Sequence, residues 1–345
     1  MTERLDSNNG YTALRLAAAF SVILTHSYVL LGLKEDWLAA RGFPQFSEIG
    51  VAAFFALSGF LVCRSLQRNP APFIYLRNRA LRLLPGLAVL MLVTVFVVAP
   101  LLTHEWHADW LSYFCNLSLF KATPYLSGVF AENPVQVVNG SLWTLPLEVV
   151  CYLMLLGLSW SGALNWRGTL LVFATFGAML FGGMLQASNY FMGFDTFQLV
   201  RVGLFFWGGA FLATVNLPRS WLLWSCTVIA AALPYFLLDR TYDWHYREVA
   251  YYLLLPFIVN FVAIRLSALS FLDRFDFSYG IYIYAFVVQQ VIVARYGAGM
   301  HPVTLSALSV AATTPIAAAS WFLVERPALA LKNRRRYASI PHPYP

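Results

Sequence analysis

The feature that most constrains this chain of 345 residues is a series of apolar runs, each about 20 residues long. A membrane-spanning helix needs about 20 consecutive apolar residues to cross the hydrocarbon core. Charged residues make up only 11% of the chain, against roughly 25% in an ordinary soluble domain. A water-soluble fold of this composition would expose large apolar patches. The sequence therefore predicts an all-α fold, a polytopic integral membrane helix bundle.

Ten such runs are present, and we expect each to form one transmembrane helix. They lie at about 11–33, 46–66, 83–103, 141–160, 168–187, 196–215, 220–238, 248–268, 277–297 and 302–324. No linker or internal repeat separates them, so residues 1–345 are expected to form one integral membrane domain, with spans over about 11–327 and a basic tail at 328–345. The first run is longer than the core of a cleaved signal peptide, about 7–15 residues, and we expect it to be retained.

The charges of the connections predict the orientation of the bundle. The connection between the second and third spans carries no acid and five arginines, which are Arg64, Arg68, Arg77, Arg79 and Arg82. The C-terminal tail is also basic, so the positive-inside rule places this connection and both termini in the cytoplasm. An even number of spans independently requires the termini to share a side. In such a protein, basic clusters mark the cytoplasmic face, and we expect no nucleic-acid partner.

Several other features are expected to be structural. The four cysteines are widely spaced, so neither a disulfide framework nor a zinc site is indicated, and we expect no bound metal. Ser58 and Gly59 in the second span are typical of positions where membrane helices approach closely. The long third connection, at about 104–140, carries four aromatic residues that suit a membrane interface, which are Trp106, Trp110, Tyr113 and Phe120.

Ionisable side chains inside spans are costly, so each is a candidate functional residue. The first span holds Arg15 and His26. Eleven residues at about 100° per residue bring both side chains to one helix face, about 16 Å apart along the axis. Arg15 would lie near the cytoplasmic end and His26 about two-thirds of the way across. Two structural explanations stay open, in which Arg15 reaches a lipid phosphate and His26 hydrogen-bonds a neighbouring helix.

The fourth span carries Glu148, about seven residues from its outer end by helix counting. His26 lies at a similar depth on a helix of the opposite direction. A carboxylate beside a histidine can fix the tautomer that a general base requires. We therefore predict a pair of Glu148 with His26, and the alternative is a glutamate bonded to other helices with no histidine partner.

The arginine cluster of the second connection predicts a phosphate site, because guanidinium groups donate parallel hydrogen bonds to phosphate oxygens. The positive-inside rule alone is the other explanation for the same residues. Arg201 enters the sixth span near its outer end. Glu325 closes the tenth span beside Arg326, and a local ion pair is the expected arrangement there. Together these residues suit a phosphorylated donor that binds from the cytoplasm and reaches into the membrane.

These residues occur in motifs that resemble those of the membrane O-acyltransferases of acyltransferase family 3. The similar segments run in order along the chain, and are Arg15-x10-His26, residues 50–61, Arg79-x-x-Arg82 with Pro85, residues 141–148 with Tyr152, Arg201 with Phe205, Phe206 and Gly209, residues 278–284, and residues 324–327. Each motif alone is weakly specific, whereas seven in register over residues 14–327 are strongly so. Two departures are visible. Ala285 stands where many members have a histidine after the ninth-span tyrosines, and the chain resembles the stand-alone form without a fused extracytoplasmic hydrolase-like domain.

The resemblance implies transfer of an acyl group, most often acetyl, from cytoplasmic acyl-CoA to a hydroxyl of an extracytoplasmic glycan. Acetyl-CoA would be a substrate, with no permanently bound cofactor. The donor would contact Arg15, Arg79 and Arg82, with Arg64 and Arg77 as helpers. His26 would be the base or the acyl acceptor, oriented by Glu148. Acceptor-binding, oxyanion-stabilising or structural roles are left open for the other motif residues, which are Ser141, Trp143, Tyr152, Arg201, Tyr279, Tyr282 and Glu325.

Two other classes of function compete with this interpretation. A transporter or flippase of a lipid-linked sugar would also use buried charge in a polytopic bundle. A membrane sensor would bind acyl-CoA without consuming it. The family and the charge bias together imply a multi-pass protein of the bacterial cytoplasmic (inner) membrane. The acceptor, the acyl length, the oligomeric state and any separate partner are not determined by the sequence.

Overall fold

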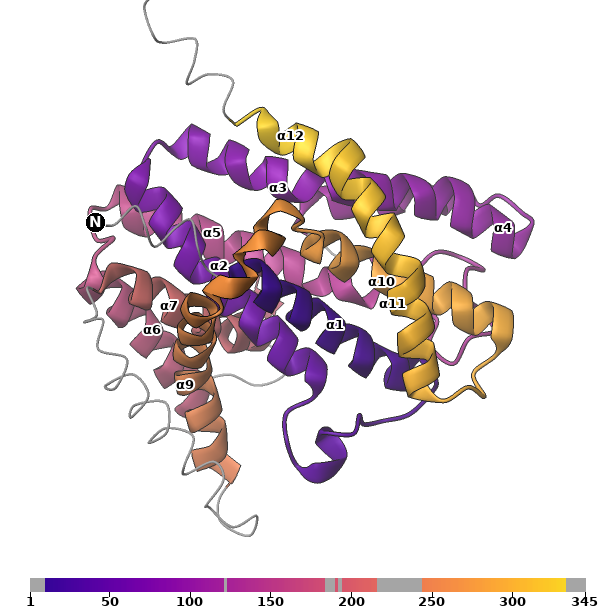
Figure 1. Ribbon diagram of the computed structural model, residues 1–345, viewed down its shortest axis with the longest axis horizontal. Coiled ribbons are helices and arrows are strands. Elements are labelled where there is room, and N and C mark those ends of the chain that lie inside the picture. The colour runs from indigo at the N-terminus through magenta and orange to yellow at the C-terminus, as the bar shows by residue number, and fades with distance from the viewer. Residues whose placement is uncertain (1–9, 121–122, 184–189, 192–193, 216–243, 333–345) are drawn as a thin grey trace, which may run out of the picture.

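The computed structural model describes residues 10–120, 123–183, 190–191, 194–215 and 244–332, and this part of the chain is almost entirely helical (Figure 1). The all-α prediction is confirmed. The main helices are α1 Tyr11–Leu30, α2 Phe46–Arg68, α3 Pro72–Val93, α5 Thr144–Trp160, α6 Trp166–Phe181, α7 Thr196–Thr214, α9 Trp244–Arg265, α10 Ser278–Tyr296 and α11 Pro302–Ser320. The shorter elements are η2 Ala39–Arg41, η3 Thr94–Val98, α4 Ala99–Thr103, η4 Ala108–Ser118, η5 Gly140–Trp143, η6 Ser267–Arg274, η7 Trp321–Glu325, α12 Arg326–Ala330, and the paired strands β1 Tyr190–Phe191 and β2 Phe194–Asp195.

The described helices can be compared with the ten expected membrane spans. Among the described residues, six helices are long and apolar enough to cross a membrane, and a seventh follows if the bent pair Val249–Arg265 and Ala268–Arg274 counts as one span. α6 has only 16 residues. α10 matches its predicted range but carries tyrosines and two glutamines, and most of its side chains are buried within the bundle. The predicted span 220–238 and most of the basic tail lie outside the described residues, so ten spans and cytoplasmic termini are not confirmed.

Two of the helices extend beyond their predicted limits. α3 begins at Pro72, a residue that suits the first turn of a helix, and continues through the π-helix η3 and α4 to Thr103. The prediction began this span only at residue 83 because the arginines before it are not apolar. Arginine is nevertheless a good helix former. Arg77, Arg79 and Arg82 are therefore on a rigid helix and not in a loop. α11 likewise continues through the π-helix η7 and α12 to Ala330.

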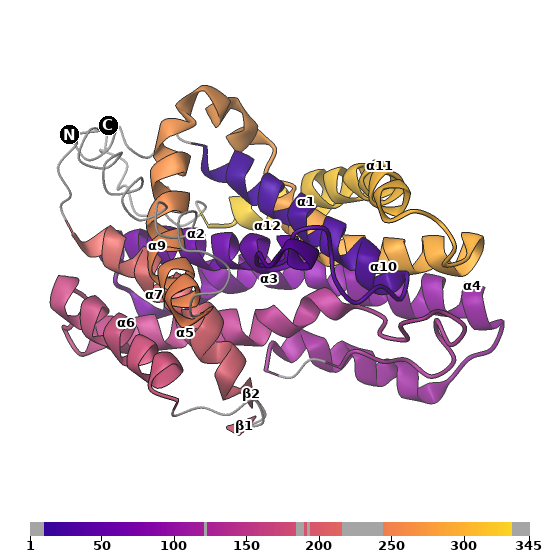
Figure 2. The same cartoon turned by 90° about the horizontal axis from the view of Figure 1, so that it is seen from below.

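The helices pack closely around α1 and α2. α2 lies against α1 and α7, α1 also contacts α10 and α11, and α6 and α9 pack on α7. Figures 1 and 2 show α10 and α11 away from α6, α7 and α9, with α1 between the two groups. Where α2 and α7 meet, a Cβ at Gly59 would lie 1.9 Å from the carbonyl oxygen of Phe206, and one at Gly209 would lie 2.0 Å from that of Ala56. The close approach expected at Gly59 is confirmed.

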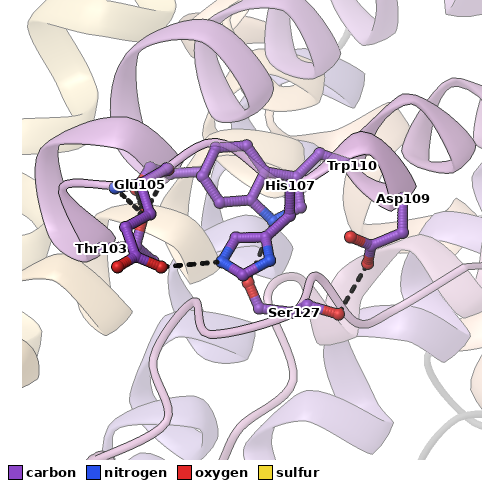
Figure 3. Close-up of polar contacts among 7 residues, drawn as sticks. Thr103, Glu105, His107, Asp109, Trp110 and Ser127 are labelled. Atoms are coloured by element: carbon purple, nitrogen blue, oxygen red, sulfur yellow. Dashed lines mark hydrogen bonds and ion pairs between the residues drawn. The ribbon is translucent and has the colours of Figure 1, made fainter.

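Within the connection between α4 and η5, polar and aromatic side chains of the described residues contact one another (Figure 3). The Ser127 hydroxyl donates to Asp109 Oδ2 at 2.7 Å, and the indole of Trp110 donates to the Ser127 carbonyl oxygen at 3.0 Å. His107 Nε2 lies 3.9 Å from a Glu105 carboxylate oxygen. Of the four aromatic residues expected at the membrane interface, Trp106 and Phe120 are exposed, whereas Trp110 and Tyr113 are buried in the core of the protein.

Candidate functional site

Two cavities lie toward opposite ends of the same helices. The arginine cavity, of about 110 Å³, is lined by Arg15, Arg79, Arg82 and Glu148. The histidine cavity, of about 220 Å³, is lined by His26 and by the first turns of α2 and α7. Arg15 near the start of α1 and the middle of α2 line the arginine cavity, whereas the second half of α1 and the first turns of α2 line the histidine cavity. Val51 and Tyr282 line both cavities, so they form the wall between them.

An acid outside the cavity lining, Asp276, joins two of the arginines that line the arginine cavity. Asp276 Oδ2 accepts hydrogen bonds from Arg15 Nη1 and Arg82 Nη2, both at 2.8 Å, and its Oδ1 accepts one from the Ser278 hydroxyl. Burial acts to raise the pKa of Asp276, but the guanidinium groups of Arg82 and Arg15 outweigh it and lower this pKa to about 2. The carboxylate is therefore ionised at neutral pH. It fastens the start of α10 to α1 and α3.

Arg79 and Glu148 form the other polar wall of the arginine cavity. The Arg79 guanidinium lies 5.8 Å from the centre of the Tyr152 ring. Glu148 Oε1 accepts hydrogen bonds from the Ser58 hydroxyl at 2.9 Å and from the Tyr152 hydroxyl. Three arginines and one acid, Glu148, thus line this cavity, and Asp276 binds two of the arginines without belonging to the lining. Such a cavity suits an anionic ligand.

The two arginines predicted as helpers lie outside this lining. The Arg64 guanidinium stacks 5.2 Å from the centre of the Phe60 ring. Arg77 Nη2 donates to the backbone carbonyl of Lys332 at 3.4 Å, which places the end of the chain's last described segment beside the arginines of α3. Burial, and then the neighbouring Arg79, Arg82 and Arg77, lower the pKa of Lys332 to about 8. This region is therefore strongly cationic.

His26 is half-buried in the histidine cavity and packs edge-on against Phe286, with ring centres 4.9 Å apart. Its Nδ1 is buried and has no hydrogen-bond partner among the described residues. The structure does not form the predicted pair with Glu148. Glu148 lies one to two turns further along α5 than the residues that reach the histidine cavity, and its hydrogen bonds are made with Ser58 and Tyr152. The depth of Glu148 and His26 in the membrane, counted from the sequence, could not resolve a difference of one to two helical turns.

The short helix η5, which precedes α5, and the first half of α10 supply the wall near His26. Ser141 and Trp143 both line the histidine cavity, the first buried and the second 40% exposed. The Ser141 hydroxyl is buried without a partner among the described residues. Its carbonyl accepts a hydrogen bond from the Tyr282 hydroxyl at 3.0 Å, and that hydroxyl also lies 2.7 Å from Thr144 Oγ1. Tyr282 is therefore fixed in the wall between the cavities.

Arg201 lies in the histidine cavity, on α7. Its Nη2 donates to Glu48 Oε1 at 2.9 Å and its Nε to the Tyr252 hydroxyl at 2.7 Å. Glu48 also caps the start of α2, because its Oε2 accepts from the backbone N–H of Gln45. The ion pair thus ties α2 to α7 at the end of the bundle where His26 lies.

Tyr279 and Glu325 lie close to the arginine cavity. Tyr279 lines it and donates to the carbonyl oxygen of Leu83 at 2.7 Å. Glu325, at the end of the π-helix η7, is buried and accepts from the Ser320 hydroxyl at 3.0 Å. The expected local ion pair with Arg326 is not formed, because Arg326 is exposed while Glu325 points into the protein. The helix continues through both residues, so the two side chains leave it in different directions.

Three residues in or beside these cavities were missed from the sequence. Asp276 and Glu48 stand at the edges of apolar runs, where an acid is ordinarily assigned to a solvated connection. Ser58 was assigned only to helix packing. The available signal was charge balance: the arginines near one membrane face have few acids to pair with, and Asp276 is one of them.

Comparisons with known proteins identify the family of the chain. The profile of a protein family described as an acyltransferase domain, acyltransferase 3, matches residues 8–325. The chain is 28% identical over 339 residues to a protein named O-acetyl transferase from Shigella phage Sf6, with 93% of this chain and 96% of the relative covered. It is 29% identical over 365 residues to nodulation protein 10 of Rhizobium leguminosarum bv. viciae, with 94% of each chain covered. No solved structure matches the chain.

The family match covers nearly the whole chain, including both cavities and the helices that build them. The seven motifs fall within the same stretch, apart from the last two residues of the final one. Since the match spans far more than half of the sequence, the chain belongs to the acyltransferase 3 family.

Proposed function

We propose that the protein transfers an acyl group, most simply acetyl, from acyl-CoA on the cytoplasmic face of a bacterial inner membrane to a carbohydrate hydroxyl on the other face. The observation that carries the proposal is the placement of Arg15 and His26. They lie on one helix, eleven residues apart, and line cavities at its two ends. Membership of the acyltransferase family and the relative named O-acetyl transferase support acyl transfer as the reaction.

The arginine cavity is the proposed donor site. Arg15 and Arg82 share one carboxylate, that of Asp276, so both retain N–H groups for phosphate oxygens. Arg79 adds a third guanidinium. Glu148 and Tyr152 stand beside Arg79. We assign Glu148 and Tyr152 to the wall of the donor site, and not to the orientation of His26.

The acyl group would pass the wall of Val51 and Tyr282 to reach His26. In direct transfer, an imidazole nitrogen of His26 takes the proton of the acceptor hydroxyl, the hydroxyl oxygen attacks the thioester carbonyl, and the C–S bond breaks. The proton then passes from the imidazolium to the departing CoA thiolate. In the other route, an imidazole nitrogen attacks the thioester carbonyl, the C–S bond breaks and the CoA thiolate leaves. The acceptor hydroxyl oxygen then attacks the acyl-imidazole carbonyl, the C–N bond breaks, and the hydroxyl proton passes to the CoA thiolate. Both routes need an imidazole nitrogen without a hydrogen-bond donor on it, and the Nδ1 of His26 has no partner among the described residues.

The test is acetyl-CoA consumption by the purified, detergent-solubilised protein in the presence of candidate glycans. His26→Ala should abolish turnover while the affinity for acetyl-CoA stays within about twofold of wild type, because the donor phosphates bind at the other end of α1. His301→Ala is the matched control, since His301 is exposed at the start of α11 and lies outside the described lining of both cavities. Equal turnover in wild type and His26→Ala would contradict the assignment, and binding without turnover in the wild type would contradict the reaction.

A further inference from the structure

The histidine cavity holds one ion pair whose charges cancel. Among the described residues that line it, Arg201 and Glu48 are the two with permanent charge, and they lie 2.9 Å apart. Each is also held by a second contact, Arg201 by the Tyr252 hydroxyl and Glu48 by the backbone N–H of Gln45. The pair is therefore a rigid feature of the wall with no net charge.

This pair remains within reach of a ligand. The side chains of Arg201 and Glu48 are 27% and 38% exposed, which is more than packing between α2 and α7 alone would leave. Arg201 makes three of its five possible hydrogen bonds within the protein, to Tyr252, Gln198 and Glu48. Two N–H groups are left for a ligand. A carboxylate keeps lone pairs beyond those already used, so the pair can both donate to and accept from hydroxyl groups.

The rest of the wall suits a sugar ring. Trp143 offers a half-exposed indole, whose face is suited to the C–H face of a pyranose. Ser141 contributes a buried hydroxyl that has no partner within the described part of the chain, and Gln45 and Gln198 contribute amide side chains to the lining. Ligand sites commonly combine an apolar wall with a few fixed polar groups in this way.

We propose that the histidine cavity selects an uncharged pyranose over an acidic one, and that Glu48 determines this selectivity. The inference rests on the proposed function and names the acceptor class of the same site. A sugar carboxylate would meet Glu48, a like charge, and Glu48 already balances the charge of Arg201, the cation that could bind it. Burying a carboxylate without a cation of unbalanced charge is unfavourable. Hydroxyl groups meet no such penalty.

The experiment compares kcat/KM for methyl pyranosides with that for the matching uronates, across the gluco, galacto and manno series, with acetyl-CoA as donor. The wild type is expected to favour the neutral sugar in each matched pair that it accepts. Glu48→Gln keeps the size and the hydrogen bond to Gln45 but frees the charge of Arg201. It should shift the ratio toward the uronate by at least about tenfold. Glu48→Asp retains the charge and should restore the wild-type preference.

Glu35→Gln is the matched control, because Glu35 is an exposed acid before α2 that lies outside the described cavity lining. A purely structural role of the pair would lower stability or turnover for both sugars equally and leave the ratio unchanged in Glu48→Gln, which would overturn the inference. A wild type that acetylates uronates as well as neutral sugars would overturn it too. Absence of acetyl transfer to every sugar would instead contradict the proposed function.

Discussion

The crossing of α2 and α7 gives a prediction whose size follows from the structure. In Gly209→Ala, the new Cβ would lie 2.0 Å from the carbonyl oxygen of Ala56. A carbon and a carbonyl oxygen rarely come closer than about 3.3 Å, so the two helices must separate by about 1.3 Å. Overpacking of this kind costs about 1–3 kcal/mol, and this backbone contact belongs at the upper end of that range. The same separation would pull Arg201 on α7 away from Glu48 on α2.

The assay is thermal unfolding in detergent, followed by tryptophan fluorescence. Gly209→Ala should unfold at a clearly lower temperature than the wild type. Gly157→Ala in α5 is the matched control, because a Cβ there would meet nothing within 4 Å. Alanine is a better helix former than glycine by about 0.8–1 kcal/mol, so this variant should be neutral or slightly stabilised. The reasoning fails if Gly209→Ala unfolds at or above the temperature of Gly157→Ala.

Two further predictions concern the arginine cavity. Asp276→Asn removes the carboxylate shared by Arg15 and Arg82, and breaking such a buried pair should lower the free energy of unfolding by about 3 kcal/mol. Asp273→Asn is the control, because Asp273 is exposed and its loss should change stability little. Equal unfolding temperatures of the two variants would contradict this. The lowered pKa of Lys332, about 8, means that this group loses its positive charge as the pH rises from 7 to 9, so acetyl-CoA affinity should fall over that range. Lys332→Met should bind more weakly at pH 7 and lose this dependence, and a dependence that persists in the variant would exclude Lys332 as its source.

The sequence predicted the helices well because their signal is local. Apolar length and the positions of Arg15, His26 and Gly59 within their runs correspond to observed elements. Hydropathy cannot tell a membrane-spanning helix from one enclosed by protein, and most side chains of α10 are buried within the bundle. A hydropathy pattern also places the limit of a helix at the first charged residues. The predicted start of α3 is therefore eleven residues after the observed one, Pro72.

The site was predicted residue by residue but not contact by contact. Arg15, Arg79 and Arg82 do meet in one cavity, as their shared positive charge near one end of the helices indicated. Glu148 was paired with His26 on depth alone, and a difference of one to two helical turns is within the error of that estimate. Asp276 is separated from Arg15 by 261 positions, and no periodicity in a single sequence reports such a contact.

The central claim is that donor and acceptor occupy opposite ends of the same helices and therefore opposite sides of the membrane. Proteoliposomes test it directly, with radiolabelled acetyl-CoA outside and an acceptor glycan either trapped inside or added outside. Detergent permeabilisation supplies the total activity, and His26→Ala supplies the background. The account predicts labelled glycan when the acceptor is trapped inside, and none when donor and acceptor are both outside sealed vesicles. Transfer at the permeabilised rate with both substrates on the same side would contradict it.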